Sequence, residues 1–330
     1  MDIRQLIGDF AANTKFSDVH IHANKPLALR VQGNIETFGS AIPLASIDAF
    51  LQEHLDAKQL NDLATHRDVD LALNIASSRY RLNVFHAMNQ PALSLRKIES
   101  SIPKMHELNL PPAVQDMLDA NSGLILVTGS TGSGKSTSLS AMIDYLNETR
   151  DGHILTIEDP VEYIHENKKC IVSQREVGRD AASFRSALRA ALREDPDIIL
   201  IGEMRDQETI ELALTAAETG HLVFGTLHTG SAPDCINRII DAMPEGKESQ
   251  IRGQLSQTLL MVMTQRLFRR QDGEGRVAAF ELMVCNSAVR NLIRESKIHQ
   301  IHSVMQTGSS SGMICMDKSI ENLRASGCIL

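Results

Sequence analysis

This sequence has few aromatic residues and no excess of positive charge. Its 330 residues include no tryptophan, three tyrosines and nine phenylalanines. Proteins that bind single-stranded nucleic acid commonly stack the bases on aromatic side chains, and few are available here. The 33 lysines and arginines are outnumbered by 41 aspartates and glutamates, so the formal net charge is −8. Because nonspecific nucleic-acid binding depends on a basic surface, we expect no nucleic-acid partner.

Long apolar runs and paired cysteines are also missing. No apolar run approaches the roughly 18 residues of a membrane-spanning helix, and the N-terminus lacks the apolar block of a signal peptide. We therefore expect a cytoplasmic protein without an integral membrane segment. The five cysteines are scattered, and no Cys-x-x-Cys occurs. This spacing supports neither a zinc knuckle nor a disulfide framework, so the cysteines are expected to be free thiols.

Residues 1–100 are predicted to form a small α/β domain. The spacing of apolar residues predicts helices over 2–14 and 47–63. Alternation of apolar and polar residues predicts the strands 18–22, 27–32, 70–75, 80–85 and 92–98. Residues 101–112 contain three prolines, which interrupt helices and central strands. We therefore expect residues 101–112 to link the first domain to a second one over 113–330.

Short, wholly apolar runs alternate with helical patterns in the second domain. The runs are 124–127, 154–157, 198–201 and 222–224. Continuous apolar strands that alternate with helices predict a parallel sheet covered on both faces. Ligands of such sheets bind at the carboxyl ends of the strands, so the functional residues are expected there.

A phosphate-binding loop follows the first of these runs. It fits G-x-x-x-x-G-K-[ST] and comprises Gly129, Ser130, Thr131, Gly132, Ser133, Gly134, Lys135, Ser136 and Thr137. The glycines let backbone N–H groups converge on phosphate oxygens, and the helix predicted over 138–146 adds its positive end. Lys135 would reach the β- and γ-phosphates, and the Ser136 hydroxyl would bind Mg²⁺. This motif alone leaves kinases, GTPases, helicases and motors open.

Carboxylates follow two further predicted strands. Glu158 and Glu162 come after the second apolar run, and Glu203 comes after the third. A carboxylate beside a γ-phosphate can orient the attacking water or hold the water shell of a metal ion. We favour a catalytic role for Glu203 and, less strongly, for Glu158, while Glu162 is balanced between catalysis and a solvated position. Asp206 is expected to be a helix N-cap.

Three arginines are spaced four residues apart in a helix predicted over 180–195. On such a helix Arg185, Arg189 and Arg193 would share one face, where like charges cost a few tenths of a kcal/mol per pair. Either solvent offsets this cost, or an anion does, such as a nucleotide phosphate across a subunit boundary.

Two histidines, His221 and His228, bracket the fourth apolar run. Their position fits two interpretations equally: hydrogen-bonded structural residues, or sensors of a γ-phosphate. A zinc site is disfavoured, because no third ligand shares their spacing.

Taken together, these motifs resemble the PilT-type retraction ATPases of type IV pili, within the broader group of secretion ATPases. Besides the phosphate loop, the matching segments are an aspartate box over 156–163, a Walker B region over 192–203 and a histidine box over 217–229. Residues 288–295, Ala-Val-Arg-Asn-Leu-Ile-Arg-Glu, are similar to a retraction-specific A-I-R-N-L-I-R-E segment, with Val289 in place of isoleucine. Residues 17–22 and 79–83 fit as well.

The resemblance implies a fold, an activity and a set of site residues. The fold is α/β: a PAS-like N-terminal domain followed by a RecA-like ATPase domain with a parallel-sheet core. The activity is ATP hydrolysis with Mg²⁺ in a homohexameric ring that retracts pili for twitching motility. ATP is expected between the two domains, and an inner-membrane platform protein at the pilus base is the expected partner. The implied residues are Arg81 and Arg96 for nucleotide binding, Arg189, Arg193 and Arg205 near the phosphates, Glu203 to activate water, Glu158 and Glu162 to assist it, and the pair His221 and His228.

Four other functions stay open at this point. An assembly motor for pili or type II secretion is disfavoured, because such relatives carry extra N-terminal domains and a four-cysteine zinc insert that this sequence lacks. A RecA-type DNA translocase is disfavoured by the acidic balance and the few aromatic residues. A small-molecule kinase has no need of an arginine-bearing N-terminal domain. A nucleotide-binding module without turnover requires that Glu203 be idle.

Overall fold

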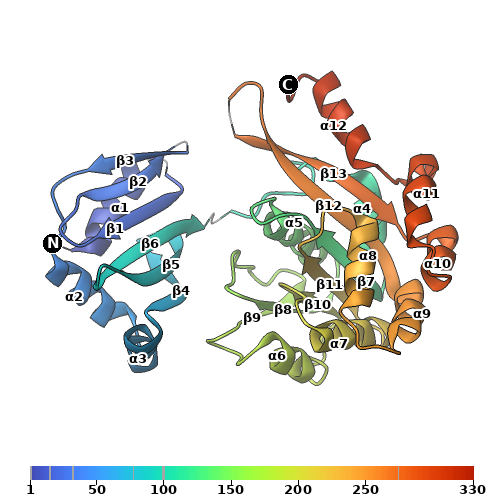
Figure 1. Ribbon diagram of the computed structural model, residues 1–330, viewed down its shortest axis with the longest axis horizontal. Helices are drawn as coiled ribbons and strands as arrows, with labels where there is room; N and C mark the ends of the chain where they lie inside the picture. The colour runs from blue at the N-terminus through green and yellow to red at the C-terminus, as the bar shows by residue number, and fades with distance from the viewer. Residues whose placement is uncertain (1, 15, 32, 77, 99–100, 274) are drawn as a thin grey trace. The chain divides into compact units, whose positions relative to one another are not determined.

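The computed structural model describes residues 2–14, 16–31, 33–76, 78–98, 101–273 and 275–330. The chain divides into two units, Met1–Ser101 and Ile102–Leu330 (Figure 1). The predicted boundary at residue 100 and the last residue of the strand predicted over 27–32 lie outside the described ranges. Within the described ranges, no helix is both long enough and apolar enough to cross a bilayer.

The N-terminal unit is built on a six-stranded antiparallel sheet with the order β3-β2-β1-β6-β5-β4. Its elements are α1 (Ile3–Asn13), β1 (Asp18–His22), β2 (Leu27–Val31), β3 (Asn34–Phe38), α2 (Leu44–His54), α3 (Ala57–His66), β4 (Asp68–Ile75), β5 (Ser78–Ala87) and β6 (Gln90–Ile98). Alternation places residues such as Val19, Ile21 and Leu82 in an apolar core shared with Ile3 and Ile7 of α1. The five predicted strands are confirmed.

Two details of this unit differ from the prediction. One helix was expected over 47–63, but α2 ends at His54 and α3 begins after Asp56. Asp56 accepts a hydrogen bond from the Gln59 N–H at 2.8 Å, and the Gln59 side chain accepts one from the Asp56 N–H at 3.0 Å. This capping box starts a new helix, although the apolar spacing continues through it. Strand β3 was not predicted, because its residues are largely exposed at the sheet edge and do not alternate.

The C-terminal unit contains a seven-stranded sheet with the order β13-β12-β7-β11-β10-β8-β9. The strands are parallel except for β13, which pairs antiparallel with β12. The elements are α4 (Pro112–Leu118), β7 (Gly123–Thr128), α5 (Lys135–Thr149), β8 (Gly152–Glu158), β9 (Cys170–Glu176), α6 (Phe184–Ala191), β10 (Ile198–Ile201), α7 (Gln207–Glu218), β11 (Leu222–Leu227), α8 (Ala232–Asp241), α9 (Glu248–Thr258), β12 (Leu259–Arg269), β13 (Arg276–Val284), α10 (Ser287–Arg294), η1 (Ile298–Gln300), α11 (Ile301–Thr307), η2 (Ser309–Ser311) and α12 (Met316–Ala325).

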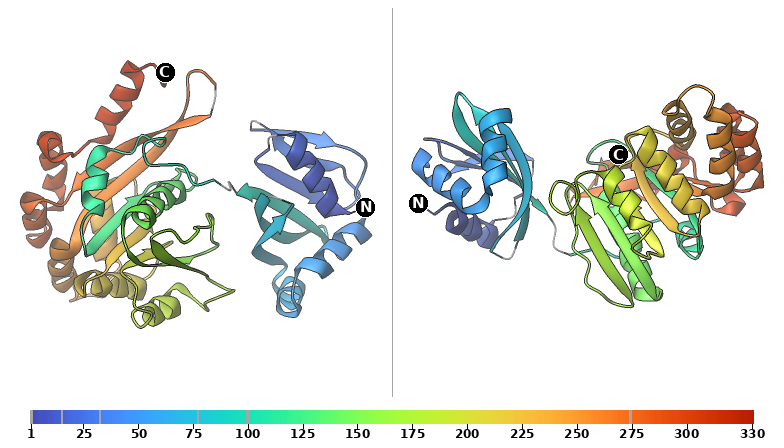
Figure 2. Two further views of the ribbon diagram at one scale, coloured as in Figure 1. Left: turned by 180° about the vertical axis from the view of Figure 1, so that it is seen from behind. Right: turned by 90° about the horizontal axis from the view of Figure 1, so that it is seen from below.

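Helices cover both faces of this sheet, as Figure 2 shows. One apolar cluster packs alternate strand residues such as Leu126 and Ile199 against α6, α7, α8 and α9. A second packs the intervening residues, such as Ile125 and Leu200, against α4 and α5. Strands buried on both faces need continuous apolar runs, and each fully buried aliphatic side chain contributes roughly 1.5–3 kcal/mol. The predicted parallel sheet with two covered faces is therefore confirmed.

Two predicted segments look different in the structure. Residues 102–111 belong to the C-terminal unit, where Leu108 and Leu110 pack on the cluster beside α4 and α5. The helix predicted over 180–195 is wrong in length, because α6 spans only Phe184–Ala191. Asp195 adopts a left-handed conformation with φ of 53° and precedes a proline, which disfavours helical backbone.

Candidate active site

Four neighbouring parallel strands bring the predicted site residues to one edge of the sheet. Strands β7, β11, β10 and β8 lie side by side in that order. The phosphate loop follows β7, His228 follows β11, Glu203 lies just beyond β10, and Glu158 ends β8. Parallel strands place their carboxyl ends at the same edge. Residues far apart in the sequence are thereby collected at one site.

The phosphate loop curls through three glycines in left-handed conformations. The φ angles are 137° at Gly129, 74° at Gly132 and 90° at Gly134, and L residues other than glycine rarely adopt them. Gly134 is the N-cap of α5, and no side chain of the described residues caps this helix. The first N–H groups of α5 therefore need another acceptor, which a phosphate would supply.

Lys135 lies folded back onto this loop. Its ammonium group donates to the backbone oxygens of Gly129 at 2.9 Å and Ser130 at 3.1 Å. Burial lowers the pKa of Lys135, while the charges of Glu203 and Glu162 act in the opposite direction. A partly desolvated ammonium is a strong partner for an anion. Lys135 can exchange its two carbonyl acceptors for phosphate oxygens.

Glu203 is held from two sides by cationic or polar groups. Its Oε2 atom lies 2.7 Å from a guanidinium nitrogen of Arg205, and its Oε1 atom lies 3.2 Å from Nε2 of His228. Burial alone would raise the pKa of Glu203, but the Arg205 and His228 contacts outweigh it and hold the pKa below the usual value. Glu203 is therefore ionised at neutral pH and can accept a proton.

Glu158 has a different electrostatic environment. Its Oε1 atom accepts hydrogen bonds from the Thr156 hydroxyl at 2.7 Å and the Gln174 amide at 3.3 Å. Burial nevertheless raises the pKa of Glu158 to about 7, against the effect of these bonds. Two carboxylates at adjacent strand ends thus differ in protonation, which is how acid and base roles are commonly separated. Glu162 lies between β8 and β9, and its charge acts on Lys135.

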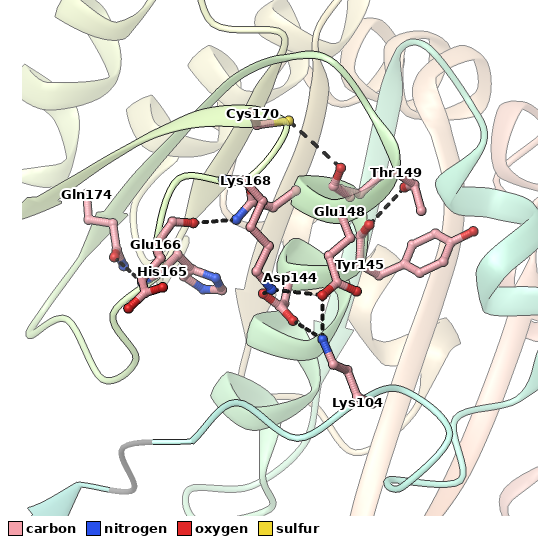
Figure 3. Close-up of polar contacts among 12 residues, drawn as sticks. Lys104, Asp144, Tyr145, Glu148, Thr149, His165, Glu166, Lys168, Cys170 and Gln174 are labelled. Carbon is pink, nitrogen blue, oxygen red and sulfur yellow. Dashed lines mark hydrogen bonds and ion pairs between the residues drawn. The ribbon is translucent and has the colours of Figure 1, made fainter.

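The helix that begins with Lys135 is tied to two other segments by a charged cluster on its far half (Figure 3). Asp144 is almost fully buried and pairs with Lys104 at 2.8 Å and with Lys168 at 2.5 Å. Glu148 pairs with the same lysines at 2.7 and 2.9 Å. Lys168 belongs to the segment that carries Glu162, so the cluster fixes this segment against the phosphate-loop helix.

The predicted arginine row is not formed. Arg185 lies 2.6 Å from the Glu208 carboxylate, and Arg189 pairs with the same carboxylate. Arg193 lies beyond the end of α6 and is exposed. The prediction of three arginines on one helix face is therefore wrong, because the helix ends at Ala191. Glu208 offsets the like-charge repulsion between Arg185 and Arg189. The spacing of the arginines did not reveal this partner.

His221 is not brought to the phosphate loop within this chain. It precedes β11, and its Nδ1 atom lies 2.9 Å from the Ala216 carbonyl oxygen. Its own carbonyl accepts from the N–H of Gly123, which begins β7. The phosphate loop follows the other end of β7, about 20 Å away for six residues of strand. Of the two histidines, only His228 reaches the loop.

Arg81 and Arg96 are cross-strand neighbours in the N-terminal unit. Arg81 lies 3.3 Å from the Asp70 carboxylate on β4. Arg96 donates to Asp18 on β1 at 2.9 Å, and Arg30 lies 3.7 Å from the same carboxylate. Both side chains are therefore oriented by carboxylates of their own sheet, and their predicted contact with a nucleotide stays a prediction.

Sequence reasoning missed two residues that contact the phosphate loop: Tyr163 lies 3.1 Å from the Thr137 hydroxyl, and Gln265 donates to the Ser133 carbonyl. Thr264, beside Gln265 on β12, contacts Thr128 of β7 at 2.8 Å and joins the two strands without touching the loop. A polar pair inside the apolar strand Leu259–Arg269 was the available signal for Thr264 and Gln265. The five cysteines are free, as expected, and hold no disulfide.

Comparison with known proteins gives consistent matches over the whole chain. The pattern of the Type II/IV secretion system protein family matches residues 2–323. The chain is 46% identical to the type IV pilus retraction ATPase PilT of Pseudomonas aeruginosa, covering 100% of this chain and 96% of that protein. It is 52% identical to a twitching motility protein of Neisseria gonorrhoeae, covering 79% and 70%. A crystal structure of the pilus retraction motor PilT with bound ADP superposes with a TM-score of 0.92 at 44% identity, covering 100% and 95%.

Proposed function

The chain belongs to the Type II/IV secretion system protein family, and we propose that it is an ATP-hydrolysing motor that retracts type IV pili. One observation carries this proposal: identity of 46% to a retraction ATPase extends over the full chain, including both units. The fold similarity to a retraction motor with bound ADP supports the same conclusion. The phosphate loop, the ionised Glu203 and His228 supply the chemistry that such a motor needs.

Nucleotide binding in this proposal starts from the phosphate loop. The backbone of Gly129–Thr137 surrounds the phosphates, and the uncapped start of α5 adds its N–H groups and its dipole. Lys135 leaves the carbonyls of Gly129 and Ser130 and pairs with phosphate oxygens instead. Burial lowers the pKa of Lys135 in its present setting, and a nearby polyanion acts in the opposite direction by favouring the charged ammonium.

Hydrolysis in this proposal uses Glu203 as the general base. Its carboxylate accepts a proton from water while the water oxygen attacks the γ-phosphorus, and the bond to the bridging oxygen of ADP breaks. Arg205 and His228 hold the carboxylate in place. Glu158, whose pKa burial raises to about 7, is the assisting carboxylate that the family resemblance implies. Glu162, Arg189, Arg193, His221, Arg81 and Arg96 stay predictions from the family resemblance.

Mg²⁺ is the metal ion that fits the donor set at this site. The Ser136 hydroxyl lies at the start of α5, and Mg²⁺ commonly takes one or two protein oxygens together with phosphate and water oxygens. No group of three or more histidine, cysteine, aspartate or glutamate side chains among the described residues could hold a metal ion. Bound to the nucleotide and Ser136, the ion would neutralise charge that develops on the phosphates.

Assembly and location follow from the same proposal. We infer a homohexameric ring that works in the cytoplasm on an inner-membrane platform protein at the pilus base. ATP-driven changes in subunit contacts would then move this platform. The runner-up function is a motor for pilus assembly or type II secretion, which belongs to the same family.

A deletion strain separates these two functions. If the protein retracts pili, cells without it should carry excess surface pili and should not twitch, and the wild-type gene should restore motility. Bald cells would instead favour the assembly motor. The Glu203→Gln variant provides the matched control: it should fail to restore motility although the protein is made. Purified protein that releases no phosphate from ATP would contradict both functions.

A further inference from the structure

Gln265 is a fully buried amide next to the phosphate loop, and nothing above assigns it a function. It lies on β12, immediately after Thr264, which is paired in register with Thr128 at the end of β7. Only 1% of Gln265 is exposed. Because β7 ends at Thr128, Gln265 faces the loop on this side of β12, while on the other side it pairs with Phe280 of β13.

Three observations place Gln265 against the loop at several points. Its Nε2 atom donates to the Ser133 carbonyl oxygen at 2.5 Å. A Cβ atom at Gly129 would lie 2.5 Å from the backbone carbonyl oxygen of Gln265, and one at Gly134 would lie 2.9 Å from its side-chain Nε2 atom. The loop glycines therefore admit close approach to β12 as well as left-handed backbone.

The position of the Ser133 carbonyl fixes the direction of the next N–H group. A trans peptide unit is planar, with its C=O and N–H pointing in opposite directions. The Ser133 carbonyl points at Gln265, so the N–H of Gly134 points away from β12. Gly134 is also the N-cap of α5. The hydrogen bond from Gln265 to the Ser133 carbonyl thus sets the direction of the Gly134 N–H on the other side of the same peptide.

We propose that Gln265 is a positioning residue that orients the phosphate loop for a nucleotide polyphosphate by holding the Ser133 carbonyl. The amide does not touch the nucleotide; it sets the peptide between Ser133 and Gly134 before the ligand arrives. Preorganised donors bind better because less conformational freedom is lost on binding. The inference rests on the proposed function, since it requires that this loop bind nucleotide.

If Gln265 served packing alone, its buried polar amide would cost free energy, and this cost argues for the positioning role. Its Oε1 atom is buried without a hydrogen-bond partner among the described atoms, and so is the hydroxyl of Ser133 beside it. Burying an unpaired polar atom costs free energy, so an apolar side chain of similar size would pack better at this position. The bond to the loop is the one gain that the amide offers there.

The test compares ADP affinity in three full-length proteins. Gln265→Met keeps the volume and removes the donor, and Gln265→Glu keeps the shape and replaces the donor with a carboxylate. Thr264→Val is the matched control: it lies on the same strand, is equally buried, and loses a buried hydrogen bond without touching the Ser133 carbonyl. ADP binding is titrated at a temperature well below each unfolding transition.

We expect both Gln265 variants to bind ADP at least about tenfold more weakly, because the loss of one hydrogen bond lowers affinity by about this factor. Thr264→Val should lower the unfolding temperature and leave ADP affinity within about twofold. Either Gln265 variant with wild-type affinity would overturn the inference. So would an equal loss of ADP affinity in Thr264→Val at a matched loss of stability, because that result would make the effect one of stability alone.

Should Gln265→Met not fold, Gln265→Glu decides by the same criterion, and Gln265→Asn replaces it if neither folds. Wild-type protein that binds no ADP would overturn the proposed function as well.

Discussion

The imidazole of His228 lies 3.2 Å from the Glu203 carboxylate, measured from Nε2 to Oε1. Its other nitrogen, Nδ1, lies 3.4 Å from the ammonium nitrogen of Lys135. Lysine can only donate and a carboxylate can only accept. A neutral imidazole with its proton on Nε2 satisfies both contacts, an assignment made from the hydrogen-bond network. His228 therefore connects Lys135, the lysine proposed to bind phosphate, with the proposed general base, and a phosphate that draws Lys135 away would change the environment of Glu203.

Replacing Lys135 with alanine should abolish detectable nucleotide binding, with affinity at least about 100-fold lower. The side chain supplies a charge-assisted contact to phosphate, and its loss leaves two backbone carbonyls without their donor. Equilibrium titration with ADP measures the effect. Lys58→Ala, at an exposed lysine of α3, should bind ADP like wild type. Nucleotide affinity of Lys135→Ala equal to that of wild type would refute the assignment of the phosphate loop.

Glu203→Gln should retain ATP binding and lose turnover by about 10²–10⁴-fold. The amide keeps the size of the side chain and can still contact His228, but it cannot accept a proton from water. Phosphate release and nucleotide affinity are measured on the same preparation. Glu166→Gln changes an exposed glutamate of the same domain and should hydrolyse ATP at the wild-type rate. An unchanged rate in Glu203→Gln would show that another carboxylate is the base.

The raised pKa of Glu158 predicts a pH dependence of stability. The folded-state pKa is about 7, above the ordinary value of 4.5. The folded protein therefore binds a proton more readily than the unfolded chain, and stability falls as the pH rises from 4.5 through 7. The loss amounts to about 3 kcal/mol. Glu158→Gln cannot ionise, so its unfolding free energy should change less than that of wild type over this range. Parallel curves for the two proteins would contradict the burial of an ionisable Glu158.

Asp144→Asn should destabilise the protein by about 2 kcal/mol, because a buried carboxylate that pairs with two lysines is lost. Those lysines hold the pKa of Asp144 below its usual value, even though burial alone would raise it. The contribution of Asp144 is therefore present above pH 3.8 and disappears as the pH falls through its lowered pKa. Chemical unfolding at several pH values measures it. Asp116→Asn, on the exposed face of α4, should leave stability unchanged.

The hydrogen bonds of Arg290, which belongs to the segment 288–295, predict that this residue has a structural role. Its guanidinium group donates to the backbone oxygens of Ser256 at 2.9 Å, Gln257 at 2.6 Å and Cys285 at 3.0 Å. These bonds tie the end of α9 to the start of α10. Arg290→Met leaves the three carbonyls without this donor and should lower stability by about 3 kcal/mol. Arg294→Met, exposed on the same helix, should unfold like wild type. Equal stability of the two variants would indicate that Arg290 serves a partner instead of the fold.

Local patterns carried much of the fold. The apolar runs at 124–127 and 198–201 became strands buried on both faces, because such runs have no solvated side. The glycine spacing and the strand before it located the phosphate loop, since the backbone there requires left-handed residues. Asp206 caps α7 as predicted, accepting from the Thr209 N–H. Each of these features depends on residues that are close together in the sequence, so each could be predicted from the sequence alone.

The tertiary structure decided which distant residues meet. The parallel pairing of β11 with β7 places His228, and not His221, at the end that carries the loop. The sequence could not reveal that Glu208 pairs with Arg185 and Arg189, or that Gln265 holds the Ser133 carbonyl. These contacts join separate elements, so their partners depend on strand order and packing. Sequence determined the kind of site; the order of the strands determined its members.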